Sequence, residues 1–235
     1  MMTSWLGWGY PDFAKSQYNR LRRGMLRARL RSRDFTIVSN NCWGAHVYQQ
    51  LGIPYQTPFV GLFLTPECYV TLVPRLRWYL SQQVRFVKKS KYERINEFRE
   101  KQGRLYPIGR IGDDVELQFL HYQSESDATE KWTRRAARVT HDDSRLFFKF
   151  CDRDGCTRQQ LESFDTSPVA HKVIFISTPS PSLTNAVWIP SGGATQVPDG
   201  LQLSRISPAY FDVVGWINGT DGTPPWWWPL RQPRN

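Results

Sequence analysis

Short apolar runs alternate along the chain with segments whose apolar residues recur every three or four positions. The apolar runs predict strands at residues 34–39, 57–64, 145–150, 171–178 and 184–190, and a pair of strands about an Asp-rich turn within 106–122. The helical spacing predicts helices at 42–52, 65–83, 124–139, 157–164 and 207–219. Because strands and helices alternate, we expect the α/β fold class: a layered α/β/α domain with a mixed, largely parallel sheet.

Local residue preferences mark several helix ends. Thr65 followed by Pro66 is typical of an N-cap and first helical position, and Gly52 is typical of a helix end. Pro74 lies inside the segment 65–83, where a proline removes a backbone donor. We therefore expect that helix to be kinked or interrupted.

Three regions follow from this pattern. Residues 1–33 predict a basic, helical N-terminal extension, in which Leu21, Met25 and Leu30 lie among arginines and indicate an amphipathic helix with an arginine-rich outer face. Residues 34–219 predict a single α/β domain. Residues 220–235 are rich in proline and tryptophan, which predicts an irregular tail.

The charge of the chain favours anionic partners. Its 31 Lys and Arg against 21 Asp and Glu give a net charge of +10, and residues 15–33 alone hold eight basic residues and no acid. Such a segment is typical of contact with an anionic glycan or polysaccharide precursor or with a membrane surface, and equally of a solvated helix face. We expect no specific recognition of nucleic acid.

The sequence predicts a cytoplasmic protein that is peripheral to the inner membrane. The N-terminus lacks a basic start followed by an apolar core, so we expect no secretory signal. The most apolar window, residues 59–73, contains Pro66 and Glu67 and is too short to span a bilayer. The four cysteines do not form the dense framework of a small secreted domain.

The turn SNNCWG, residues 39–44, is the first candidate site. It places Cys42 where a strand ends and a helix begins, and a helix N-terminus stabilises a thiolate. We therefore predict a partly accessible thiol of lowered pKa that acts as a nucleophile; the alternative is an inert, buried cysteine. The neighbouring oxyanion and contact residues would be Asn40, Asn41, Trp43 and Gly44.

A nucleophilic thiol needs a base. His121 ends the predicted strand 115–122, and we expect it to be the base, oriented by Asp152 at the end of another strand. All three side chains would then converge at one edge of the sheet. His46, one helical turn after Cys42, is the local substitute.

Asp152 and Asp154 form the competing constellation. A carboxylate pair at a strand end can hold a divalent ion against a diphosphate, as in sugar or phosphate-group transferases. Gly155 instead favours a tight turn, so we expect Asp152 to be structural or orienting and Asp154 to be exposed. We predict no cofactor, and a divalent metal only in this alternative.

Arginines in the predicted helix 124–139 are the third candidate. Three arginines follow the His121 strand: Arg134, Arg135 and Arg138. Their guanidinium groups could form paired hydrogen bonds with a phosphate, sulfate or carboxylate. The alternative is an exposed face paired with local acids.

These motifs carry a resemblance. The segments SNNCWGAHVYQQLGIPYQTPFVGLFL, YPIGRIGDDVELQFLHYQSESDATEKWTRRAARV, FFKFCDRDG and FDVVGWING resemble a bacterial family catalogued as domain of unknown function nineteen-nineteen, from about Asp34 to Gly219. Ala45 departs from it, since a second glycine is more usual there. Cys42 with the later His121 is also similar to papain-like cysteine peptidases.

The family resemblance implies an α/β domain and a link to exopolysaccharide or capsular polysaccharide biosynthesis. It implies no established reaction. The leading hypothesis is a cysteine-dependent acyltransferase or hydrolase with Cys42, His121 and Asp152. The alternatives are a metal-dependent transferase and a non-catalytic binder of an anionic polysaccharide or a partner enzyme.

Overall fold

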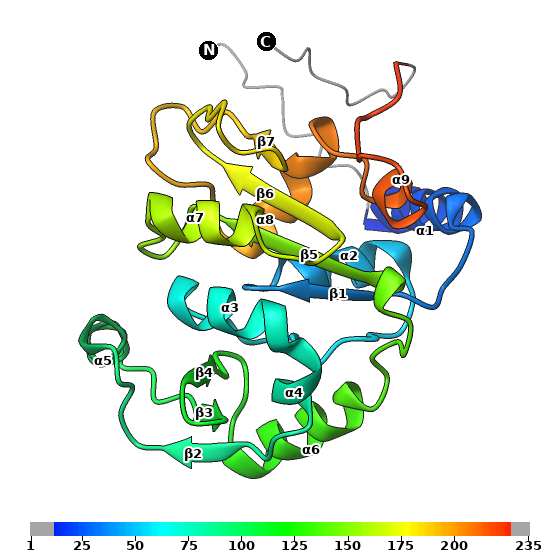
Figure 1. Ribbon diagram of the computed structural model, residues 1–235. Helices are drawn as coiled ribbons and strands as arrows, with labels where there is room; N and C mark the ends of the chain where they lie inside the picture. The colour runs from blue at the N-terminus through cyan, green and yellow to red at the C-terminus, as the bar shows by residue number, and fades with distance from the viewer. Residues whose placement is uncertain (1–11, 227–235) are drawn as a thin grey trace, which may run out of the picture.

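The computed structural model describes residues 12–226, which fold around a four-stranded parallel sheet in the order β1-β5-β6-β7 (Figure 1). Strand β1 (Thr36–Ser39) pairs with β5 (Leu146–Cys151), β5 with β6 (His171–Ile176), and β6 with β7 (Ala186–Trp188). All of these pairings are parallel. The α/β fold expected from the alternating pattern is confirmed.

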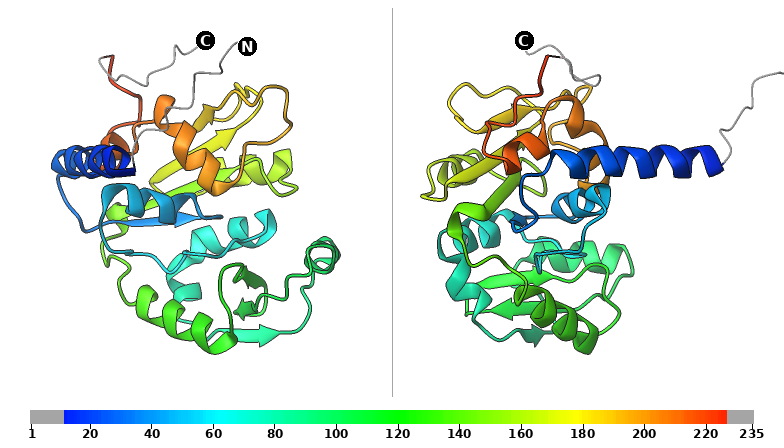
Figure 2. Two further views of the ribbon diagram at one scale, coloured as in Figure 1. Left: turned by 180° about the vertical axis from the view of Figure 1, so that it is seen from behind. Right: turned by 90° about the vertical axis from the view of Figure 1, so that its right-hand side faces the viewer.

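The apolar runs become strands because both faces of this sheet are covered by helices. Val38, Phe148 and Ile174 point to a core shared with α3 (Pro66–Leu72) and α7 (Arg158–Asp165). Their neighbours Phe147 and Val173 point to a second core. That core is closed by four helices (Figure 2): α1 (Asp12–Arg29), α2 (Trp43–Leu51), α8 (Gly200–Ile206) and α9 (Val213–Ile217).

The long connection from α2 to β5 builds a smaller lobe below the parallel sheet (Figure 1). Its antiparallel sheet has the order β2-β3-β4, with β2 (Arg85–Val87), β3 (Ile108–Ile111) and β4 (Val115–Gln118). The lobe also contains α4 (Leu76–Leu80), α5 (Glu93–Lys101) and α6 (Glu125–Ala136). The core that contains Val38 extends into this lobe through Leu117 and Trp132.

The predicted helix ends are found where the local residues place them. The Thr65 side chain accepts from the Cys68 backbone at the start of α3, and Gly52 ends α2 in the left-handed conformation. Pro74 breaks the predicted helix 65–83 into α3, a 3-10 turn (Val73–Arg75) and α4. Two further 3-10 turns are formed by Asp143–Arg145 and Ser207–Ala209. The predicted strand at 57–64 is reduced to a single bridge between Phe63 and Gln118.

The N-terminal helix forms, but its apolar face is not the predicted one. Leu26 is buried against the body, whereas 67% of Leu21 and 62% of Met25 is exposed. The apolar residues around Leu21 therefore do not form the packed face of the helix. Most of the predicted irregular tail, residues 227–235, lies outside the described residues.

Candidate functional site

The turn between β1 and α2 places Cys42 at the carboxyl edge of the parallel sheet, as the sequence predicts. Gly44 permits this close turn, because a Cβ there would lie 3.0 Å from side-chain atoms of Ile37 and Ser39. Gly200, the first residue of α8, packs on the other side, where a Cβ would lie 2.7 Å from the Trp43 backbone nitrogen. Two helix N-termini thus meet at Cys42, which is half-buried.

Burial affects the Cys42 thiol more than the helix N-terminus does, contrary to the prediction of a lowered pKa. Burial raises the pKa of Cys42, and a backbone hydrogen bond from Gly61 and the charge of Lys149 oppose this only in part. The Trp43 backbone N–H at the start of α2 donates to Asn41 Oδ1 at 3.2 Å, and the Cys42 Sγ lies 4.0 Å from the Leu62 carbonyl oxygen. Desolvation of the thiolate therefore outweighs the helix dipole here.

We expect Cys42 to be alkylated slowly at neutral pH, because a raised pKa leaves less thiolate than a free thiol has. The measurement is the rate of iodoacetamide labelling against pH, followed by peptide mass spectrometry, with Cys42→Ser to separate this signal from half-buried Cys156. The midpoint should lie above that of a small-molecule thiol measured alongside. A midpoint near neutral pH would show an activated nucleophile.

His121 and Asp152 belong to different sheets, so their expected placement on neighbouring strands is wrong. His121 follows β4, which belongs to the small antiparallel sheet, whereas Asp152 follows β5 of the parallel sheet. The His121 side chain is exposed, and its backbone N–H donates to the Gly61 carbonyl. Among the residues that the structure describes, no hydrogen bond links either residue to the thiol.

The Asp152 carboxylate holds three segments of the fold together by hydrogen bonds. Its Oδ2 accepts from the backbone N–H and hydroxyl of Ser177, at 2.6 and 2.7 Å, and its Oδ1 accepts from the Val197 N–H at 2.8 Å. The carboxylate thereby joins the ends of β5 and β6 to the segment that leads to α8. This agrees with the predicted structural role.

Asp154 forms a strained turn. Its φ is +65°, its N–H donates to Gln196 Oε1, and Arg153 Nε lies 3.4 Å from its Oδ1. Its side chain is half-buried rather than exposed, and burial raises the pKa of Asp154. Within residues 12–226, no group of three His, Cys, Asp or Glu side chains is arranged as metal ligands would be.

The two asparagines of the SNNCWG turn face a buried lysine that no sequence motif indicates. Lys149 Nζ donates to Asn40 Oδ1 and Asn41 Oδ1, both at 3.1 Å, and to Cys151 Sγ at 3.2 Å. Asn40 and Asn41 each donate their amide to the same sulfur. Lys149 is completely buried, and this burial lowers the pKa of its ammonium. The amides are thus held inward, away from the Cys42 thiol.

The other predicted contact residues have structural partners. Trp43 is buried and its Nε1 donates to Ser207 Oγ at 3.1 Å. Arg134 pairs with Glu130 on the exposed side of α6, and Arg135 donates to the Tyr122 hydroxyl at 2.7 Å. Arg138 lies beyond the end of α6, so it does not share a helical face with Arg134.

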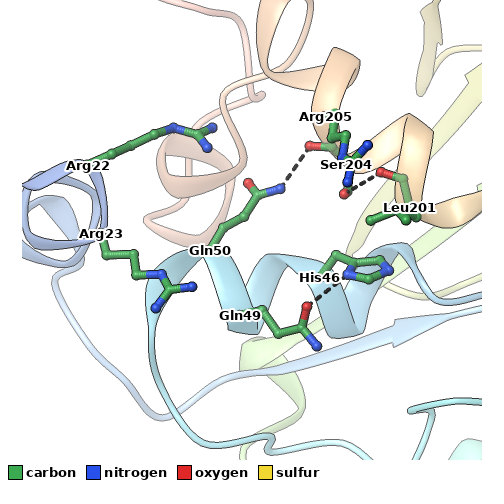
Figure 3. Close-up of a pocket in the computed structure, with 8 residues that line it drawn as sticks. All are labelled: Arg22, Arg23, His46, Gln49, Gln50, Leu201, Ser204 and Arg205. Atoms are coloured by element: carbon green, nitrogen blue, oxygen red, sulfur yellow. Dashed lines mark hydrogen bonds between the residues drawn. The ribbon is translucent and has the colours of Figure 1, made fainter. Parts of the chain in front are cut away.

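A basic pocket opens between α1, α2 and α8 (Figure 3). Its volume is about 220 Å³, and its lining contains no acidic side chain. The lining residues come from three distant stretches of the chain: Arg22, Arg23, His46, Gln49, Gln50, Leu201, Ser204 and Arg205. In Figure 3, Arg23 reaches from α1 toward α2, and Arg22 extends from α1 above it.

The polar residues of α2 in this pocket are held in place by hydrogen bonds. His46 Nδ1 lies 2.9 Å from Gln49 Oε1, and Gln50 Nε2 donates to the Ser204 carbonyl at 2.9 Å. Within the described part of the chain, no ion pair neutralises Arg22, Arg23 or Arg205. The pocket therefore presents uncompensated positive charge.

His46 links the pocket to Cys42. Its backbone N–H donates to the Cys42 carbonyl at 3.1 Å, so the two residues are one helical turn apart on α2. No described hydrogen bond joins the two side chains.

Comparison with known proteins places the chain in a family. Residues 13–218 match the model of a family described as domain of unknown function DUF1919. An uncharacterized protein of Haemophilus influenzae (strain ATCC 51907 / DSM 11121 / KW20 / Rd) is 33% identical over 198 residues, which cover 82% of this chain and 88% of that protein. The chain therefore belongs to the DUF1919 family.

Proposed function

We propose that the protein binds a phosphate-bearing precursor of a surface polysaccharide, and that the basic pocket holds the phosphate groups. The observation that carries this proposal is the lining of the pocket, in which three arginines and a histidine converge without an acidic side chain. Guanidinium groups match phosphate oxygens with paired N–H donors, and Gln49 and Gln50 add neutral amides.

The size of the pocket favours a small anionic group. Its volume of about 220 Å³ is below the roughly 300–1,000 Å³ of sites that enclose a whole drug-sized ligand. A phosphate or diphosphate fits, while an attached sugar would extend outside. The assignment to polysaccharide assembly rests on the resemblance to exopolysaccharide and capsular polysaccharide biosynthesis proteins.

Calorimetry with inorganic pyrophosphate tests the binding. We expect saturable binding that Arg205→Gln weakens about tenfold, because one charge-assisted hydrogen bond is worth about 1.5–3 kcal/mol. Arg134→Gln is the matched control, since it removes the same charge from α6, far along the chain from the pocket residues. Equal weakening by both variants would indicate attraction to net charge alone and would contradict a pocket.

Cysteine-dependent acyl transfer or hydrolysis is the second candidate. It is favoured by half-buried Cys42 with His46 one turn along and Gln49 against the histidine ring. It ranks below binding because burial raises the pKa of the thiol and Asp152 is engaged by Ser177 and Val197. The alkylation profile of Cys42 separates the two, since a thiol activated by His46 would react at neutral pH.

A metal-dependent sugar or phosphate-group transferase has less support. Asp152 would have to release the donors of Ser177 and Val197 before it could bind a cation together with Asp154. This would loosen the connection between β5, β6 and the segment before α8.

A further inference from the structure

The N-terminal helix exposes an apolar stripe. The exposed fractions of Leu21 and Met25 are 67% and 62%, and these residues lie four positions apart, so they share one face of α1. Ala28 is also exposed and continues this face. Leu26, on another side of the helix, is buried against the body. The stripe therefore points away from the fold.

The rest of α1 is strongly basic. Arg20, Arg23 and Arg27 are exposed, Arg23 and Arg27 lie close to Gly52 at the end of α2, and no Asp or Glu occurs between Asp12 and Asp34. Arginine side chains can extend their apolar stems along a lipid interface while their guanidinium groups contact phosphates. A strongly basic helix with an exposed apolar face has the composition of a helix that lies in the surface of an anionic bilayer.

Three polar contacts fix the C-terminal end of α1 to the body. Arg29 pairs with Asp212, the Asn218 amide donates to the Arg29 carbonyl at 2.7 Å, and the Arg31 N–H donates to Asn218 Oδ1 at 3.0 Å. Toward its N-terminus, α1 projects beyond the body (Figure 2, right). Leu21 and Met25 thus lie on the half of α1 that packs on the body, with their own side chains exposed.

We propose that α1 docks this protein on the surface of an anionic membrane, with Leu21 and Met25 inserted at the level of the lipid head groups. The positive charge of α1 favours an anionic membrane over a second copy of the chain as the partner of this stripe. A second copy would bring its own arginines against those of the first. Within residues 12–226, no helix is long and apolar enough to cross a membrane, so α1 would lie along the surface. The basic pocket, lined by Arg22 and Arg23 of the same helix, would then open near the lipid head groups.

Vesicle co-sedimentation of the full chain tests this inference. Wild type should bind phosphatidylcholine vesicles that contain phosphatidylglycerol and not vesicles of phosphatidylcholine alone. Leu21→Ser with Met25→Ser should weaken binding at least about tenfold, since both changes remove an apolar side chain from the lipid interface. Arg20→Gln should weaken it about fivefold, in line with about 1 kcal/mol per basic residue.

Leu105→Ser is the matched control, because Leu105 is 84% exposed and lies in the small lobe, outside α1. It should leave vesicle binding unchanged. Arg205→Gln, which should weaken pyrophosphate binding, should leave vesicle binding largely intact. The two variants therefore distinguish failure of the proposed phosphate site from failure of the proposed membrane contact. Equal binding by wild type and the Leu21 and Met25 variant would overturn the proposal. The proposal would also be overturned if wild type bound no vesicles but formed a dimer, and the double variant were a monomer. The stripe would then be a contact between two copies of the chain.

Discussion

Replacement of Lys149 with alanine should lower the free energy of unfolding by about 2–5 kcal/mol, the cost of leaving a cavity and unpaired buried acceptors. The side chain is completely buried, and its ammonium gives one hydrogen bond each to Asn40, Asn41 and Cys151. The truncation leaves these acceptors without their charged donor and also leaves a cavity. Urea unfolding followed by circular dichroism measures the change.

Lys88→Ala is the control for this experiment, because Lys88 is exposed and its loss should change the free energy of unfolding by less than about 0.5 kcal/mol. The pH dependence gives a second test. Burial lowers the pKa of Lys149 in the folded state, so the unfolded state binds more protons between that pKa and the unfolded value of about 10.4.

The stability advantage of wild type over Lys149→Ala should therefore grow as the pH rises through this window. Below the folded pKa, the full penalty of burying the ammonium is present, and wild type has its smallest advantage. An advantage that shrinks with rising pH, or a loss below about 1 kcal/mol on truncation, would contradict the buried, charged cluster.

Asp152→Ala should lower the free energy of unfolding by about 2–4 kcal/mol, because it leaves the donors of Ser177 and Val197 without their acceptor. These donors lie on two segments that this carboxylate joins. Asp152→Asn should cost less, since one oxygen remains as an acceptor. Thermal and urea unfolding of the three proteins measure the order.

Asp154→Gly is the matched control at the same strand end. Glycine adopts the φ of +65° at this position without strain, which offsets the lost contact with Arg153, and the stability should stay within about 1 kcal/mol of wild type. If Asp152→Ala were as stable as wild type and yet lost pyrophosphate binding or thiol reactivity, the carboxylate would have an orienting role in the site instead.

The repeating apolar pattern predicted the main sheet well, for a physical reason. A parallel strand covered on both faces must be apolar at nearly every position. Such a strand is therefore recognisable in the sequence as an apolar run, as at residues 145–150. Helix ends at Thr65 and Gly52 were equally predictable, because the caps bind only backbone groups of neighbouring residues. The position of Cys42 at a strand–helix turn followed from the same local signals.

Strand pairing was not predictable in the same way. The run that ends before His121 has the composition of a strand in either sheet, and only the packing of the lobe assigns β4 to the antiparallel one. Lys149 gave a weak signal, as a charge two residues before Cys151 in an apolar strand, but its amide partners lie more than a hundred positions earlier. Nothing local indicates that contact.

The chemistry of the site depends still more on packing. Spacing alone predicts a helix N-terminus at Cys42, which lowers a thiol pKa, whereas the approach of α8 and the Gly61–Leu62 segment buries the thiol and raises it. The apolar face of α1 depends on how that helix lies against α2 and α9, and this orientation buries Leu26 and exposes Leu21. Backbone conformation is set mainly by neighbouring residues, but burial is set by segments distant in the chain, and burial decides charge, pKa and exposure.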